Sequence, residues 1–171
     1  MKNSIKIFLS LTFFIILLCS CSKNGKTEDK TVSNQTEDSL KLKLEISKYS
    51  EIKLSRKADT LTRGWPMYQD LKDEVNRLQS YTVQDVISNI PTIEKAVDSL
   101  QKTIPEAIDT FPVTSRINVL NTKAKYMLLL SEKQRPKLGK IKAIAEEYPL
   151  EFNALNVQLN EIFIELPDFE Q

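Results

Sequence analysis

The clearest periodicity in the chain is an apolar stripe between residues 138 and 166. Its members recur at alternating spacings of three and four, which is the pattern of one helix face. They are Leu138, Ile141, Ala145, Tyr148, Phe152, Leu155, Leu159, Ile162 and Leu166. Pro149 falls inside the stripe. Because proline has no N–H to donate, we expect a kink or a restart of the predicted helix there.

Three further apolar stripes with helical spacing lie upstream, at 68–78, 83–104 and 113–127. The middle stripe stays in register across Pro91. Thr82 followed by Asp85 is typical of a capping box that starts this helix. Pro66 stands where the first turn of the preceding helix is expected, a position that tolerates proline.

The segment from Leu40 to Arg63 gives a weaker signal. "LKLKLEI" alternates with period two, as a strand would, and "EIKL" could be its hairpin partner. A hairpin needs further strands or a helix face for stability, and the rest of the chain offers no strands. We therefore interpret this segment as helical, with the hairpin as the alternative.

These stripes predict an all-α fold, an antiparallel helical bundle of four to five helices with proline kinks. A stripe with spacings of three and four could also form a coiled coil between two chains. Several stripes in one chain favour packing within the chain, so we expect a monomeric domain.

The N-terminus has the features of a secretion signal. Lys2 and Lys6 precede a 12-residue apolar run from Ile7 to Leu18. Spanning the hydrocarbon core of a bilayer takes about 20 residues of helix, so this run is short for a membrane anchor. A basic start followed by a short apolar run is the pattern of a signal peptide.

The next residues, Leu18-Cys19-Ser20-Cys21, resemble the lipobox of bacterial lipoproteins. The resemblance implies cleavage before Cys21, fatty acylation of Cys21 and anchoring in a membrane through the N-terminal lipid. Ser22, where an Asp would retain the lipoprotein at the inner membrane, favours the outer membrane, on either its periplasmic or its surface face. Two or more acyl chains are needed to hold a protein stably in a bilayer.

Three regions follow from this interpretation. Residues 1–20 form a lipoprotein signal peptide, and residues 21–39 form the lipidated cysteine and a disordered tether. Residues 22–39 are polar, with a single aliphatic residue, Val32, so they bury too little apolar surface to fold. Residues 40–171 form the helical bundle domain.

Composition excludes several classes of function. The chain contains no His, and Cys19 and Cys21 are its two cysteines. Acylation of Cys21 leaves the mature chain without a free thiol, so His- and Cys-based nucleophilic systems and ordinary zinc, copper or haem sites are excluded. Without Lys2 and Lys6, 22 basic residues stand against 23 acidic ones. This balance argues against nucleic acid as a partner, and we expect neither a cofactor nor a metal ion.

Asparagines accompany two of the apolar stripes, those at 113–127 and 138–166. Each comes directly after an apolar stripe residue, although asparagine is a weak helix former. The candidate binding seam consists of Asn118, Asn121, Asn153, Asn156 and Asn160, together with Arg116. Each amide can donate and accept hydrogen bonds. The seam is either an amide-lined groove for a peptide or glycan, or a set of hydrogen bonds that fixes the register of the helices.

The stretches "SRINVLNTKAKY" and "EFNALNVQLNEIF" resemble small helical lipoproteins of Gram-negative bacteria that have no established activity. The resemblance covers the C-terminal half and implies a helical fold. We expect a membrane-anchored, non-catalytic binding or interaction module of the cell envelope, with an envelope protein, peptide or glycan as partner. The alternatives are a carboxylate-based enzyme acting on envelope polysaccharide and a structural spacer without a ligand.

Overall fold

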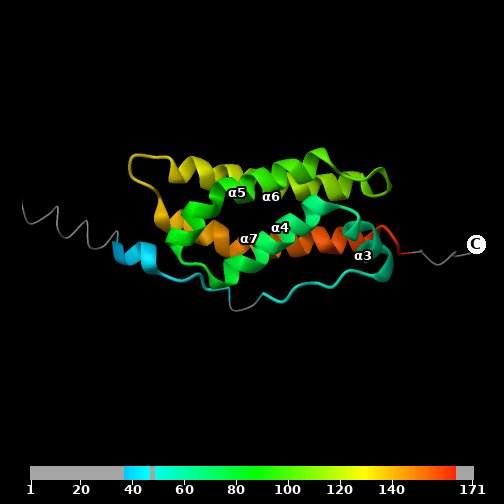
Figure 1. The fold of residues 1–171 in the computed structure, drawn as a ribbon, viewed down its shortest axis with the longest axis horizontal. Coiled ribbons are helices and arrows are strands. Elements are labelled where there is room, and N and C mark those ends of the chain that lie inside the picture. Colours follow the sequence, from blue (N-terminus) through cyan, green and yellow to red (C-terminus); the bar gives the residue numbers. More distant parts are fainter. Residues whose placement is uncertain (1–36, 47–48, 165–171) are drawn as a thin grey trace, which may run out of the picture. The chain divides into compact units, whose positions relative to one another are not determined.

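The computed structural model describes residues 37–46 and 49–164, and this part of the chain is all-α, as predicted. Besides a helical turn at 37–41, it contains five α-helices and two short 3₁₀ helices (Figure 1). They are α3 (Arg56–Arg63), α4 (Pro66–Arg77), η1 (Leu78–Ser80), α5 (Val83–Lys102), η2 (Glu106–Ile108), α6 (Phe111–Ser131) and α7 (Leu138–Glu161). The predicted bundle of four to five helices is therefore confirmed.

The four long helices enclose a single apolar core. Helices α5 and α7 each pack against both α4 and α6 (Figure 1). In α7, the predicted stripe is buried from Ile141 to Leu159, while Leu138 and Ile162 are half-buried at its ends. Leu166, the last member of the predicted stripe, lies outside the described residues. The apolar periodicity thus identified the core-facing side of the longest helix.

Prolines lie inside two of the long helices without dividing them. Pro91 is in α5 and Pro149 is in α7, and each helix is continuous across its proline. The buried residues Ile90 and Ile93 stand on either side of Pro91. Each proline removes one helical hydrogen bond, and burial of the apolar stripe on both sides outweighs that loss.

The helix starts follow their predicted signals. Thr82 and Asp85 form a reciprocal capping box: the Thr82 side chain accepts from the Asp85 N–H, and the Asp85 carboxylate accepts from the Thr82 N–H. These hydrogen bonds from Thr82 hold the pKa of the Asp85 carboxyl below its usual value. Pro66 occupies the first turn of α4, as predicted.

The prediction for 40–63 was wrong in its middle part. Only 37–41 and α3 are helical, residues 42–46 and 49–55 are not, and no hairpin forms among the described residues. Residues 42–46 make one isolated antiparallel bridge, from Lys43 to Thr82. Residues 49–55, which we call the strap, run along α7, and Figure 1 shows this segment at the edge of the bundle. Five of their backbone N–H and C=O groups find partners on α7 instead of in a helix or a sheet.

The predicted signal peptide, the acylated Cys21 and most of the predicted tether lie outside the described residues. The last three tether residues, 37–39, are helical instead. In the described part of the chain, none of the helices has the length and apolar character needed to cross a membrane.

The capping box should make a measurable contribution to stability. We expect Thr82→Ala to lower the free energy of unfolding by about 1 kcal/mol in urea titrations, because the first turn of α5 loses its side-chain acceptor. Thr122→Ala is the matched control, since the Thr122 hydroxyl is exposed and donates only to Asn118 of the same helix. Equal stability of the two variants would contradict the capping role.

Candidate functional site

Three asparagines on α7 bind the main chain of the strap, and we call Asn153, Asn156 and Asn160 the asparagine ladder. The Asn153 amide donates to the Ser50 carbonyl at 2.9 Å and accepts from the Ile52 N–H at 2.9 Å. The Asn160 amide donates to the Lys53 carbonyl at 3.0 Å and accepts from the Ser55 N–H. Each of these two amides thus pairs with residues i and i+2 of an extended chain, as a neighbouring strand would.

The spacing of the ladder matches the rise of the strap. Asn153 and Asn160 are seven residues apart, which is about 10.5 Å along a helix. Their carbonyl acceptors, on Ser50 and Lys53, are three residues apart, which is about 9–10 Å along an extended chain. A three-residue repeat is that of polyproline II, and Ser55 has the matching φ of −61° and ψ of 159°. One asparagine for every two turns of α7 therefore meets one three-residue turn of the strap.

Asn156 connects the strap to the core from the middle of the ladder. It is fully buried. Its amide donates to the Ile52 carbonyl at 3.2 Å and accepts from the Tyr68 hydroxyl at 2.7 Å. The Tyr68 ring stacks between Trp65 and Phe152, with ring centroids 6.0 Å and 5.4 Å away. One side chain thus joins α7, α4 and the strap.

The strap itself buries little. None of its side chains is fully buried, and Tyr49 and Leu54 contribute only partly buried contacts to the core. An ion pair between Lys72 on α4 and Glu51, at 2.7 Å, adds a weak contact, because solvent screens the two charges. The ladder is therefore the principal attachment of the strap.

Tyr49, the first residue of the strap, has a buried hydroxyl group without a hydrogen-bond partner among the described residues. Burial, with the nearby Glu51 carboxylate, raises the pKa of Tyr49 to about 12. Burial also raises the pKa of Tyr68 and Tyr148 above the ordinary tyrosine value.

The other predicted seam residues form a separate cluster. The Asn121 amide donates to Gln101 of α5 at 2.6 Å, and the Gln101 amide donates to Asn118 at 2.6 Å. Asn121 is buried, whereas Asn118 is exposed. Arg116 is exposed and makes no ion pair with another described residue. The structure thus brings the three α7 asparagines together and leaves the α6 residues apart from them.

Two grooves flank the strap. One, of about 510 Å³, lies between the strap and α3 and α4, with Tyr68 and Lys72 among its lining residues. The other, of about 410 Å³, lies beside Asn160 at the end of α7, with Leu54 and Phe163 among its lining residues. Both are large enough to hold an amino-acid side chain.

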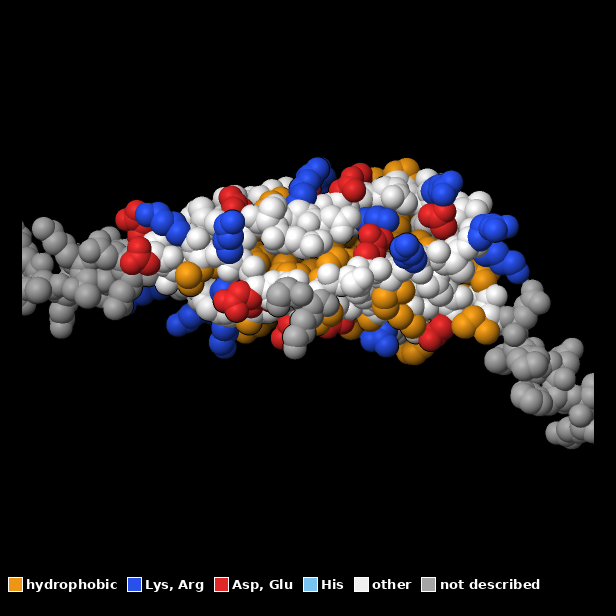
Figure 2. All heavy atoms as spheres, turned by 90° about the horizontal axis from the view of Figure 1, so that it is seen from below, with side chains coloured by type: hydrophobic (Ala, Val, Ile, Leu, Met, Phe, Trp, Pro, Cys, Tyr) orange, Lys and Arg blue, Asp and Glu red, His pale blue; other side chains and the backbone are white. Residues whose placement is uncertain are grey.

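The ladder is the set of neutral polar side chains that the described residues gather at the strap. Within 37–46 and 49–164, no group of three or more acidic side chains is placed to hold a metal ion. On the face shown in Figure 2, basic and acidic side chains are interspersed, with no extended field of one sign. The ladder offers amide donors and acceptors to a polypeptide main chain.

Sequence reasoning found the ladder residues but not what they bind. The strap and Tyr68 were missed, because the partners of the ladder lie 88 to 107 positions away along the chain. The seven-residue interval between Asn153 and Asn160 was the available signal. Nothing in it specified an extended segment as the partner.

No protein-family model, curated protein or solved structure matches this chain. The resemblance of the C-terminal half to small helical lipoproteins stays a prediction.

Removing the central amide of the ladder should destabilise the domain. We expect Asn156→Leu to cost about 2–3 kcal/mol of unfolding free energy, because it leaves the buried Tyr68 hydroxyl and the Ile52 carbonyl without partners. Asn118→Leu, at an exposed position, should change stability by less than about 0.5 kcal/mol. Similar losses in both variants would contradict a special role for Asn156.

The buried tyrosines should make the fold sensitive to alkali. An unfolded tyrosine loses its proton near its ordinary pKa of 10, whereas folded Tyr49 keeps its proton up to about pH 12. The unfolded state therefore binds fewer protons above pH 10, and stability should fall as the pH rises from 10 to 12. Phenolate absorbance and circular dichroism should change together in this range.

A matched variant isolates Tyr49. Tyr49→Phe should flatten the loss of stability between pH 10 and 12 and should not destabilise the domain at pH 8, because the hydroxyl has no partner to lose. An unchanged slope would show that Tyr49 does not titrate late.

Proposed function

We propose that the chain is a lipid-anchored, non-catalytic binding module of the cell envelope. Its ladder on α7 binds an extended segment of a partner polypeptide in the place of the strap. The observation that carries this proposal is the paired amide geometry of Asn153 and Asn160 on the main chain of the strap.

The ladder recognises main chain and not side chains. Every hydrogen bond between the ladder and the strap ends on a backbone carbonyl or N–H. Peptide recognition through main-chain groups supplies affinity that depends weakly on sequence, and neighbouring pockets then supply specificity. The two grooves beside the strap are suited to that second task.

The energetics of the strap favour exchange. Asn153 and Asn160 make two hydrogen bonds each with the strap and Asn156 makes one. Each is worth about 0.5–1.5 kcal/mol net. Ordering the backbone of the strap costs conformational entropy, which opposes this gain. With no fully buried side chain to add, the strap should open at a free energy well below that of global unfolding.

The acylated N-terminus defines where such a module acts. A lipid on Cys21 would hold the domain at the membrane that contains its partners, which raises their effective concentration. This part of the proposal rests on the lipobox-like sequence Leu18-Cys19-Ser20-Cys21.

Site-specific photo-crosslinking in bacterial cells producing the full-length protein tests the binding proposal. A crosslinker at Glu161, an exposed position directly after Asn160, should capture a polypeptide partner. A crosslinker at the exposed position Tyr126 on α6 is the control. Capture at Glu161 that disappears with Asn153→Leu and Asn160→Leu supports the proposal. Equal capture at both positions, or none, favours a spacer.

The anchor has its own test. Cys21→Ala should abolish incorporation of labelled fatty acid and processing of the precursor, because the acceptor thiol is lost. Cys19→Ala is the matched control and should be labelled normally. Equal labelling of the Cys21→Ala variant and the parent would contradict lipidation at Cys21.

A further inference from the structure

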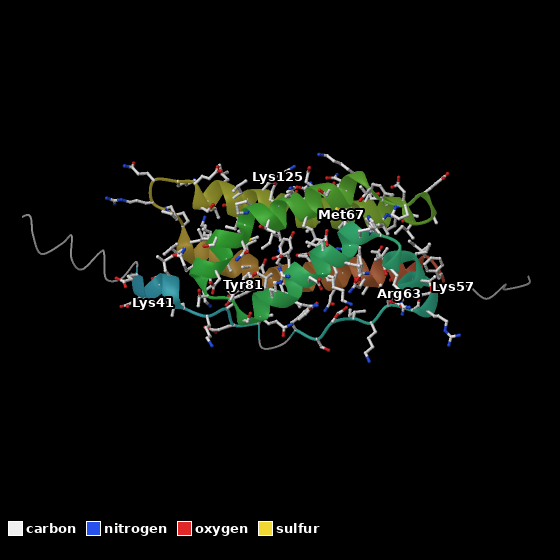
Figure 3. All side chains as sticks on the ribbon, in the orientation of Figure 1. Lys41, Lys57, Arg63, Met67, Tyr81 and Lys125 are labelled. Carbon is white, nitrogen blue, oxygen red and sulfur yellow. The ribbon has the colours of Figure 1, made fainter. Side chains whose placement is uncertain are left out.

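A third cavity lies between α4 and α5. Its volume is about 490 Å³, within the range of small-molecule sites. Helix α4 lines it along its length, from Met67 through Asp70, Asp73 and Glu74 to Arg77. Figure 3 labels Met67 at the start of α4 and Tyr81 beyond its end. The lining of this cavity includes no strap or ladder residue.

Glu74 is the feature of this cavity that the fold does not explain. Among the described residues it is the one charged side chain that is buried, with 8% of the side chain exposed. Its Oε1 accepts from Arg77 at 2.5 Å, while its Oε2 is buried without a hydrogen-bond partner in the described chain. A buried carboxylate is costly unless its oxygens are satisfied.

The rim of the cavity carries unpaired charge. Among the described residues, Asp70, Asp73 and Lys95 make neither hydrogen bonds nor ion pairs through their side chains. Three carboxylates therefore face two cations, counting Glu74 and Arg77, which leaves one net negative charge. Such a site favours a ligand with positive charge.

The remaining walls suit an aliphatic ligand. Met67 and Ala96 contribute apolar surface, and Thr92 and Ser99 contribute the neighbouring hydroxyl-bearing wall on α5. Methionine adapts to irregular aliphatic shapes. The cavity thus combines an acidic inner group, an acidic rim and an apolar side.

We propose that the α4–α5 cavity binds a small aliphatic ammonium ligand of the diamine class. One ammonium group donates to Oε2 of Glu74, the second lies at Asp70 and Asp73 on the rim, and the methylene chain packs on Met67 and Ala96. Ammonium–carboxylate hydrogen bonds are the strong class of such contacts. Oε2 of Glu74 is buried in this structure, so the ligand reaches it only when the Arg77 side chain, which is 59% exposed, moves outward. This site is independent of the function proposed for the ladder.

Isothermal titration of cadaverine into the full-length acylated protein in neutral detergent tests the proposal. The parent should bind cadaverine, and Glu74→Gln should lower the affinity by about tenfold or more, because a charged hydrogen-bond acceptor is lost. Glu132→Gln is the matched control, since Glu132 is exposed in the turn after α6, outside the cavity lining. It should bind cadaverine as the parent does.

A second variant keeps the proposal testable if Glu74→Gln does not fold. Ala96→Leu keeps Glu74 and fills the apolar side of the cavity, and it too should lose cadaverine binding. Free lysine, which adds a carboxylate to the same diamine skeleton, should bind more weakly than cadaverine. Absence of cadaverine binding by the parent, equal binding by Glu74→Gln or Ala96→Leu, or stronger binding of lysine would each overturn the proposal.

Discussion

An extended chain segment that lies on a helix has no neighbouring strand to pair with, yet its backbone N–H and C=O groups still need hydrogen-bond partners. In this protein the partners are asparagine side chains. An amide is suited to the task because it carries a donor and an acceptor side by side, as the backbone does. A carboxylate could only accept, so aspartate at position 153 or 160 could not pair with both Ser50 and Ile52 or both Lys53 and Ser55.

The position of the strap follows from this pairing. Two turns of α7 advance by nearly the same distance as three residues of extended chain, so amides at 153 and 160 repeat in phase with the strap. Between them, Asn156 accepts a hydrogen bond from Tyr68 of α4, and the Tyr68 ring stacks on Phe152 of α7. The strap, which directly precedes α3, is thus held by hydrogen bonds to its main chain, whereas the core is held by apolar contacts. From this division we expect the strap to open more readily than the bundle.

Much of the fold could be predicted from local patterns. The stripe from Ile141 to Leu159, the Thr82 cap and the position of Pro66 depend on residues close together in the chain, where helical spacing and capping rules apply. The strap could not be predicted, because it is fixed by residues about one hundred positions away. Alternation in "LKLKLEI" reflected a segment in which Leu44 is buried and Leu42 exposed, without a strand partner. The candidate seam was found for the same local reason, and its division between α6 and α7 depends on packing. Glu74 gave no signal in sequence, since a glutamate on a helix is ordinarily on the surface.

Amide hydrogen exchange of the strap, resolved by NMR, tests the central role of the ladder most directly. The N–H groups of Ile52 and Ser55 donate to Asn153 and Asn160, whereas those of Lys53 and Leu54 have no acceptor among the described residues. The account predicts slowed exchange at Ile52 and Ser55 and fast exchange at Lys53 and Leu54, with the protection at Ile52 lost in Asn153→Leu. Uniformly fast exchange across all four amides, or protection that survives this substitution, would contradict it.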